Sequence, residues 1–269
     1  MAESRERARA GDRRVRTAQV LRTARITPRM VRIVLGGADL ADLQSGEYTD
    51  EYVKLLFARP ELDRPAMRSI TVRHWDSRAG DLTIDVVDHG PGGLAGPWAV
   101  AAQPGDEIGI RGPGGGYTPN AEVDWHLMIG DESALPAIAA SLERVSGGVP
   151  AYAFIEVADK SEEQPLETPG ELSVVWVHRD KAPSGPGTAL VEIVRGSWLP
   201  SGTGQAFLHG EAGMVKELRH HLRFERGIAR ELLSVSGYWR RGTTDEGWRA
   251  QKADWTREVE ADESQLDPT

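Results

Sequence analysis

"RGPGGGYTPN", from Arg111 to Asn120, divides the chain into two parts with different residue patterns. Glycine and proline crowd together in it, which is typical of a turn between domains. The chain has 269 residues, which is long for one domain and comfortable for two. This stretch is therefore the predicted domain junction.

The part before the junction has short β-branched and aromatic runs separated by turn signals. The expected strands are Val15–Leu21, Met30–Leu35, Tyr52–Phe57, Ser69–Trp75, Leu82–Val87 and Asp106–Ile110. Several short strands at close spacing predict an antiparallel β-barrel or sandwich.

The part after the junction alternates short apolar runs with helical patterns. The expected strands are His126–Ile129, Tyr152–Val157, Leu172–Val177, Gln205–Leu208 and Leu232–Val235, and the expected helices are Ser133–Arg144, Thr188–Arg195 and Ala212–Arg226. This alternation predicts a parallel sheet covered on both faces. A last, polar helix is expected over Asp245–Val259, with Trp248 and Trp255 seven residues apart on one face.

Composition narrows the functional classes. The net charge is −9, from 41 acidic and 32 basic residues, so nucleic acid is a poor candidate partner. The chain has no cysteine, which excludes disulfides and thiolate chemistry and favours a cytoplasmic location. The sequence contains no run of 18 apolar residues, so no membrane-spanning helix is predicted. The Arg-rich start lacks the apolar segment of a secretory signal.

A candidate ligand-binding turn lies in "HLMIGDESALPAIAASLERV" (His126–Val145). A buried strand breaks at Gly130, and Ser133 is expected to cap the following helix. Ligands bind beyond the carboxyl ends of parallel strands, and the start of a helix suits phosphate. Asp131 and Glu132 would repel phosphate and favour hydroxyls or amides. An ordinary strand-turn-helix stays open as the alternative, because no G-x-G-x-x-G or P-loop is present.

A second candidate pairs "DHGPGGLAGPWA" (Asp88–Ala99) with Arg68 of "MRSITVRHWD" (Met67–Asp76). The glycines can expose N–H groups as an anion nest, and arginine binds phosphate with a planar fork. Together they are a candidate pyrophosphate site. Alternatively, the glycines only make turns.

A third candidate is "SGYWRRGTTDEGW" (Ser236–Trp248), which follows the last expected strand. Tyr238 and Trp239 could stack on a flat ligand, with the arginines that follow beside an anion. The alternative is an aromatic core end followed by a solvated basic pair.

These motifs, in this order, resemble the siderophore-interacting proteins, ferric-siderophore reductases of the ferredoxin–NADP reductase-like superfamily. The resemblance rests on RSITVR, HG..G.A..WA, PGD, GDESALPAI, GE and GYWRRG, and it spans about Val15 to Trp255. The chain departs from the family pattern at four positions. Ile70 replaces tyrosine, Leu94 and Gly96 replace proline and serine, and Ser133 replaces threonine.

The resemblance implies an FAD-binding β-barrel domain at 12–118 and an NAD(P)H-binding α/β domain with a C-terminal helix at 119–259. The Arg-rich start and the acidic end predict disordered tails at 1–11 and 260–269. It implies that NADH or NADPH reduces FAD, which then reduces Fe(III) in a ferric siderophore. No acid–base residue and no protein metal site are required. The oligomeric state stays open, with a monomer as the working expectation.

The resemblance also implies the site residues. Those expected to bind cofactors are Arg68, Ser69, Ile70, Thr71, Asp85, Val86, Val87, Asp88, His89, Gly90, Gly93, Leu94, Ala95, Gly130, Asp131, Glu132, Ser133, Ala134, Glu211, Tyr238 and Trp239. Those expected to attract an anionic siderophore are Lys54, Arg240 and Arg241.

Two other functions stay open from the sequence: a reductase of the same superfamily with another acceptor, and a flavin-free module that only binds a siderophore. The choice between NADH and NADPH is open as well. Glu156 and Asp159 would suit a ribose hydroxyl, whereas Arg179 and Lys181 would suit a 2′-phosphate.

Overall fold

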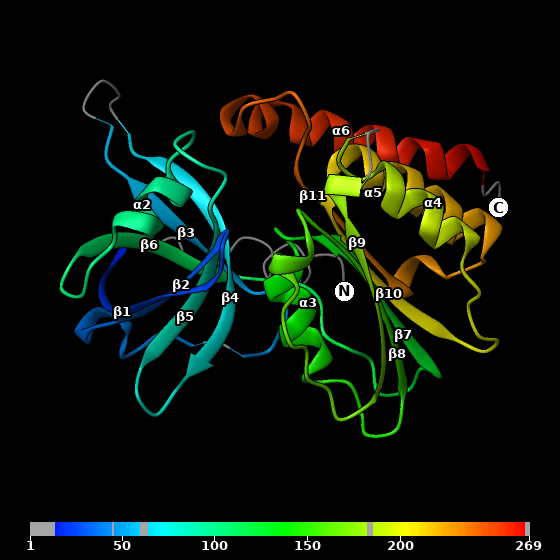
Figure 1. Cartoon of the computed structure of the whole chain (residues 1–269), viewed down its shortest axis with the longest axis horizontal. Helices are drawn as coiled ribbons and strands as arrows, with labels where there is room; N and C mark the ends of the chain where they lie inside the picture. The colour runs from blue at the N-terminus through cyan, green and yellow to red at the C-terminus, as the bar shows by residue number, and fades with distance from the viewer. Residues whose placement is uncertain (1–13, 45, 60–63, 182–184, 267–269) are drawn as a thin grey trace. The chain divides into compact units, whose positions relative to one another are not determined.

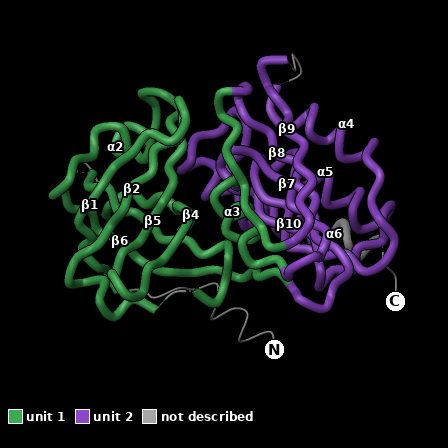
Figure 2. The backbone as a smooth tube through the Cα atoms, turned by 60° about the horizontal axis from the view of Figure 1, so that its bottom comes forward, with its two compact units in different colours: residues 1–119, 135–145, 161–169 green, residues 120–134, 146–160, 170–269 purple. Residues whose placement is uncertain are grey.

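The computed structural model describes residues 14–44, 46–59, 64–181 and 185–266, without the side chains of 262–266. It has two compact units (Figure 2). The barrel unit comprises residues 1–119, 135–145 and 161–169, and the sheet unit comprises residues 120–134, 146–160 and 170–269. The expected tail at 1–11 lies outside the described residues.

The barrel unit contains six antiparallel strands that close in the order β1-β2-β5-β4-β3-β6 (Figure 1). The strands are β1 (Arg16–Thr27), β2 (Met30–Gly36), β3 (Tyr52–Phe57), β4 (Ala66–Asp76), β5 (Asp81–Val87) and β6 (Glu107–Gly114). Of the two architectures predicted for this part, the structure has the barrel.

The barrel core follows the period of two expected of strands. Val53 and Leu55 of β3, and Leu82, Ile84 and Val86 of β5, are buried in one apolar cluster. The residues between them point outward, because successive side chains of a strand lie on opposite faces. The outer faces of β3 and β4 are thus free to carry polar groups.

A short helix, α2 (Ala95–Ala101), follows the Gly-rich stretch. The sequence suggested only a turn there, because Gly96 and Pro97 disfavour helix. Proline is tolerated in a first turn, where its missing N–H would have no helical acceptor. An added Cβ at Gly96 would lie 3.2 Å from the carbonyl oxygen of Val87, so this glycine permits close packing of α2 on the end of β5. A 3-10 turn, η1 (Ala38–Leu40), follows β2.

The sheet unit contains five parallel strands in the order β11-β10-β7-β8-β9. They are β7 (Trp125–Asp131), β8 (Pro150–Val157), β9 (Glu171–His178), β10 (Gly204–Glu211) and β11 (Leu233–Trp239). Every residue of β7 and β10 is buried. Burial of consecutive residues is expected of a parallel sheet covered on both faces, which confirms that prediction.

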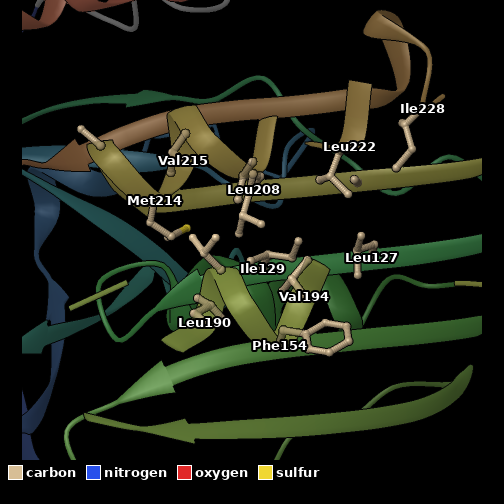
Figure 3. Packing of buried hydrophobic residues seen from close by; sticks show 14 of the residues in the cluster. Leu127, Ile129, Phe154, Leu190, Val194, Leu208, Met214, Val215, Leu222 and Ile228 are labelled. Carbon is tan, nitrogen blue, oxygen red and sulfur yellow. The ribbon is translucent and has the colours of Figure 1, made fainter. Parts of the chain in front are cut away.

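Helices pack on this sheet through apolar side chains (Figure 3). They include α4 (Thr188–Gly196) and α5 (Ala212–His220), which continues as a π-helical segment, η4 (His221–Glu225). Leu190 and Val194 of α4 and Val215 of α5 belong to one cluster with Leu127 and Ile129 of β7. The remaining segments are α3 (Leu135–Leu142), which clusters with the barrel unit, and the 3-10 turns η2 (Lys160–Glu162), η3 (Arg179–Lys181) and η5 (Arg230–Leu232).

The C-terminal helix, α6 (Asp245–Leu266), buries Trp248 and Trp255 on one face as predicted. Their ring centroids are 5.5 Å apart in an edge-to-face arrangement. The helix continues past the expected end at Val259 to Leu266, because the first helix breaker in the sequence is Pro268. Among the described residues, no helix is both long and apolar enough to cross a membrane.

Candidate functional site

One candidate site begins with an open side of β4. This strand pairs with β3 over Ala66–Thr71, but with β5 only through Val72, His74, Trp75 and Asp76. In an antiparallel pair, alternate residues direct their N–H and C=O groups away from the partner strand. Part of the backbone of 66–71 therefore points away from β3 and has no partner residue on β5. Backbone groups need hydrogen-bond partners, so this stretch can accept water or a ligand.

The predicted binding residues of β4 lie on this open stretch. Ser69 is exposed, and Arg68 and Ile70 are half-buried. Arg68 Nη1 donates to the carbonyl oxygen of Met67 at 3.0 Å. Ile70 packs against the barrel core. Thr71 is buried on the outer face, so its hydroxyl is the least accessible of the set.

The glycine loop leaves β5 beside this stretch. Gly90 and Gly93 have φ angles of 89° and 83°, and an added Cβ at either would meet nothing within 4 Å. The loop thus combines left-handed backbone with open space, as an anion nest requires. His89 is exposed, Leu94 is half-buried, and Ala95 begins α2.

The residues before the loop are engaged within the barrel unit. Asp85 is buried, and both its oxygens accept from Arg32 of β2 at 2.7 Å. Val86 is part of the core, and Val87 ends β5. Asp88 accepts from the N–H of Gly90 at 2.9 Å, which fixes the start of the loop. Their contribution to a ligand therefore stays a prediction.

The second candidate site lies at the carboxyl edge of the parallel sheet. The chain passes from β7 to β8 and β9, and then returns to β10 on the other side of β7. Connections from β7 and β10 thus leave in opposite directions. Open α/β sheets bind ligands outside the strand ends at such a switch point. The edge carries Gly130–Asp131 of β7, Gly210–Glu211 of β10 and Tyr238–Trp239 of β11.

The Asp131 carboxylate holds this edge together. It is buried, and Oδ2 accepts from the N–H of Glu211 at 2.9 Å and from the indole of Trp239 at 2.8 Å. Oδ1 accepts from the N–H of Ser133 at 2.9 Å and from its hydroxyl. The hydroxyl expected to cap α3 is thus bound to Asp131 instead. Ala134, also expected to bind a cofactor, is fully buried after this turn.

The same carboxyl has a shifted pKa. Burial, followed by the neighbouring charge of Glu132, raises the pKa of Asp131 to about 6. Hydrogen bonds from Ser133 and Trp239 act in the opposite direction, and burial is the larger effect.

Glu211 and Tyr238 are also fixed by their own unit. Glu211 Oε2 accepts from the N–H groups of Gly213 and Met214 at 2.7 and 2.9 Å, which caps α5. The Tyr238 hydroxyl lies 2.9 Å from Nδ1 of His209. Trp239 and Tyr238 are half-buried, so part of each aromatic side chain remains accessible at the edge.

The expected basic residues divide between the units. Lys54 of β3 pairs in register with Ser69, and its Nζ lies 5.9 Å from the centroid of the Tyr52 ring. Arg240 and Arg241 are exposed after β11. The N–H of Arg241 donates to Glu211 Oε1 at 3.1 Å.

Two residues that hold the predicted ones in place were not expected from the sequence. Arg32 fixes Asp85, and His209 fixes Tyr238. His209 is buried against Phe207, and burial lowers its pKa well below the usual range. One signal was available for His209: a buried histidine in an apolar strand needs a hydrogen-bond partner. For Arg32 there was none, because its partner lies 53 residues away.

Family models match most of the chain. The model "Siderophore-interacting FAD-binding domain" matches residues 19–66 and 58–117, and "Siderophore-interacting protein" matches residues 123–242. An uncharacterized protein of Mycobacterium tuberculosis is 41% identical over 264 residues, covering 87% of this chain and 93% of that protein. The ferric vibriobactin reductase ViuB of Vibrio cholerae is 30% identical over 257 residues, covering 88% and 93%. The NADPH-dependent ferric-chelate reductase of Escherichia coli is 28% identical, covering 85% and 94%.

Solved structures agree with these matches. A siderophore utilization protein from T. fusca is 38% identical with a TM-score of 0.77, covering 86% of this chain and 95% of that one. The siderophore-interacting protein SipS of Aeromonas hydrophila is 28% identical with a TM-score of 0.80, covering 91% and 98%. The FAD/NAD-binding domain of a Vibrio cholerae nitric oxide dioxygenase, 16% identical with a TM-score of 0.62 over 82% and 98%, shares the fold. The fold is thus the predicted ferredoxin-reductase type, and this chain belongs to the siderophore-interacting protein family, with an FAD-binding barrel domain.

Proposed function

We propose that this chain is an NAD(P)H-dependent flavoprotein that reduces Fe(III) in ferric siderophores and releases Fe(II) in the cytoplasm. The open backbone of β4 is the observation that carries the proposal. A barrel strand that does not pair with β5 over Ala66–Thr71, with an arginine on it and a glycine nest after β5, suits a long ligand with a pyrophosphate. Family membership and the two relatives named as ferric reductases support the same reaction.

In the barrel unit, Arg68 and the loop Gly90–Ala95 would hold the FAD phosphates. The backbone of Ser69–Thr71 would meet the ring system and ribityl chain. These groups fit FAD because backbone donors and acceptors follow one strand outside the β5 ladder, and there is room at Gly90 and Gly93. Asp85–His89 would shape the wall of the site.

In the sheet unit, the turn Gly130–Ala134 and Glu211 would receive NAD(P)H at the switch point. Asp131 fixes the indole of Trp239, which leaves a rigid aromatic surface for a flat ring. Its partner Tyr238 is anchored by His209. Because the carboxylates there accept from their own backbone, they order the edge before a ligand arrives.

When bound, FAD supplies the conversion of a two-electron hydride donor into single-electron reduction of Fe(III). Hard oxygen chelators favour Fe(III) over Fe(II), so reduction weakens the hold of a siderophore on its iron. The chain's own residues need to bind, orient and attract, and no side chain has to transfer a proton. Lys54, Arg240 and Arg241 would attract an anionic ferric siderophore to a protein of net charge −9.

An absorption spectrum of the purified full-length protein tests the proposal. We expect bound or bindable FAD, loss of the flavin's visible absorbance on adding NADH or NADPH, and its return on adding a ferric tris-catecholate siderophore. A protein that binds the siderophore but no FAD would be a binding module. A flavin that NAD(P)H reduces and the ferric siderophore does not reoxidise would indicate another acceptor.

Arg68→Ala tests the residue assignment within the same experiment. We expect FAD binding to weaken by roughly 1.5–3 kcal/mol, the range for hydrogen bonds to charged groups. Arg78→Ala is the matched control, because Arg78 is exposed in the turn after β4. Equal FAD affinity in both variants would remove Arg68 from the site.

A further inference from the structure

Three charged residues occupy the same edge of the sheet on adjacent strands. Glu132 directly follows β7, Glu156 lies near the end of β8, and Arg179 directly follows β9. In dinucleotide-binding α/β folds, the side chain at the end of the second strand distinguishes a ribose 2′-hydroxyl from a 2′-phosphate. Here β8 is the second strand of the unit. The cluster is therefore placed to discriminate between NADH and NADPH.

The guanidinium of Arg179 is already bound by both carboxylates. Its Nη1 donates to Glu132 Oε2 at 2.6 Å, and its Nη2 donates to Glu132 Oε1, so the pair is bidentate. Nη1 also lies 3.3 Å from Glu156 Oε1. Only 16% of the Arg179 side chain and 13% of the Glu132 side chain are exposed, so water screens this pair weakly.

Glu156 cannot move away from this arrangement at low cost. It is 1% exposed, and both its oxygens accept from the N–H of Gly187 at 3.0 Å. Burial raises its pKa. Burial opposes the charge of Arg179, and the hydrogen bonds and charges of the two glutamates outweigh burial and raise the pKa of Arg179. Arg179 thus stays charged and paired.

We infer that the Glu132–Arg179–Glu156 cluster makes this chain select NADH over NADPH. The inference rests on the proposed function, in which the nicotinamide nucleotide binds at this edge. Two carboxylates and one guanidinium leave the cluster with a net negative charge. Ribose hydroxyls are neutral and can donate to carboxylate oxygens, whereas a 2′-phosphate carries a charge of about −1.5 to −2.

The contacts to Glu132 and Glu156 use three of the five N–H donors of Arg179. A 2′-phosphate would have to bind the remaining donors beside two carboxylates, or displace Glu132. Displacement would leave Glu132 and Glu156 without their partner and next to the negatively charged phosphate. Repulsion between these charges would strongly weaken binding of the phosphate. Lys181 is exposed two residues beyond Arg179, and it provides a second route for a phosphate that the test must separate.

Calorimetry on the full-length protein tests the selection without requiring turnover. The two ligands are 5′-AMP and 2′,5′-ADP, which differ only in the 2′-phosphate. We expect the wild type to bind 5′-AMP at least about tenfold more tightly than 2′,5′-ADP. One strongly unfavourable charge contact has an effect of about this size. In the FAD-loaded protein, NADH should likewise bleach the flavin at lower concentration than NADPH.

Glu132→Gln should largely abolish the discrimination, because it removes one negative charge and loosens Arg179 while keeping the side-chain shape. We expect the affinity for 2′,5′-ADP to rise about tenfold relative to 5′-AMP. The double variant Glu132→Gln/Arg179→Gln should lose that gain, since the released guanidinium is its source. Glu143→Gln is the matched control: it removes the partner of Arg73 in the barrel unit and should leave the ratio unchanged.

Each outcome decides the inference. Tighter binding of 2′,5′-ADP by the wild type overturns it, and loss of that preference in Lys181→Ala would identify the residue responsible. A gain in Glu132→Gln that survives removal of Arg179 also overturns it. Reduction of the flavin by both nucleotides alike rejects the selection and leaves the proposed reductase intact. Reduction by neither rejects the proposed function itself.

Discussion

The glycine turns of the two units differ in what surrounds them. At Gly93 in the barrel unit, an added Cβ would meet nothing within 4 Å. At Gly210 in the sheet unit, it would lie 2.7 Å from Asp131 Oδ2 and 3.2 Å from Met214 Cε. Both glycines have positive φ angles, 83° and 139°. The barrel turn therefore leaves room for another molecule, whereas the sheet turn is filled by side chains of its own unit.

The polar groups of the two units differ in the same way as the glycine turns. In the barrel unit, β4 does not pair with β5 over Ala66–Thr71. At the sheet edge, Asp131 and Glu211 accept from backbone N–H groups of the edge itself. Backbone groups that lie outside a strand ladder can form hydrogen bonds with a ligand. A self-satisfied edge gains rigidity, so that a ligand meets groups already in position.

Substituting the two glycines should give the largest difference between the turns. We expect Gly210→Ala to lower the free energy of unfolding by roughly 2–6 kcal/mol, from backbone strain and overpacking against Asp131. Gly93→Ala has only the strain, about 1–2 kcal/mol. Urea unfolding measures both. Similar losses would mean that Asp131 can move aside and that the sheet turn is not tightly filled.

The pH dependence of stability should expose the buried Asp131. Its pKa of about 6 in the folded protein is higher than the value of about 3.9 in an unfolded chain. The folded state therefore binds the proton more tightly. This stabilisation is complete below about pH 4 and is lost as the pH rises through about 6, by roughly 3 kcal/mol.

Comparison with Asp131→Asn isolates this contribution from the other carboxyl groups. We expect the stability of the wild type relative to the variant to fall by roughly 3 kcal/mol between about pH 4 and pH 7. Asp180→Asn, at an exposed position, is the control and should change stability by less than about 0.5 kcal/mol. A constant difference across this range would show that the donors to Asp131 compensate fully for its burial.

Local patterns predicted the elements better than the contacts of the sites. Alternation placed β3 at Tyr52–Phe57, and apolar runs located all five parallel strands to within a few residues. The helix α2 was not predicted, because Gly96 and Pro97 have low helix propensity. Packing on the barrel favours the helix there despite this propensity. The Ser133 hydroxyl was predicted to cap a helix. It donates instead to a carboxylate oxygen of Asp131, which lies only two residues before it.

Contacts between distant strands could not be read from the sequence at all. Arg179 looked available for a phosphate, yet Glu132 binds it from 47 residues away. Which carboxylate meets an arginine depends on the register of adjacent strands, and this register emerges only when the sheet forms. The same holds for the stretch of β4 that does not pair with β5, because it depends on where β5 leaves the ladder.

A smaller effect should come from Ile70, on the open stretch of β4. The side chain is half-buried and packs against the barrel core. We expect Ile70→Tyr to strengthen FAD binding by about 0.5–1.5 kcal/mol, the usual contribution of an aromatic contact. Fluorescence titration of the apoprotein with FAD measures it, with unfolding monitored to detect loss of core packing. Weaker binding at unchanged stability would mean that the site is shaped around isoleucine.

The smallest effect should come from charge steering by Lys54, whose position opposite Ser69 places it beside the open stretch of β4. Attraction between exposed charges acts on encounter and is screened over about 8 Å at physiological salt. We expect Lys54→Ala to raise the KM for an anionic ferric siderophore roughly twofold to fivefold, the range for one exposed charge pair, and to flatten its dependence on salt.

Lys216→Ala on α5 is the control for the loss of one surface lysine. FAD content should be the same in both. Arg240→Ala should behave like Lys54→Ala, and if it loses its flavin instead, Arg240 belongs to the cofactor site. If Lys54→Ala keeps both the KM and the salt response of the wild type, the open side of β4 is a cofactor site alone, and the siderophore is recognised by other residues.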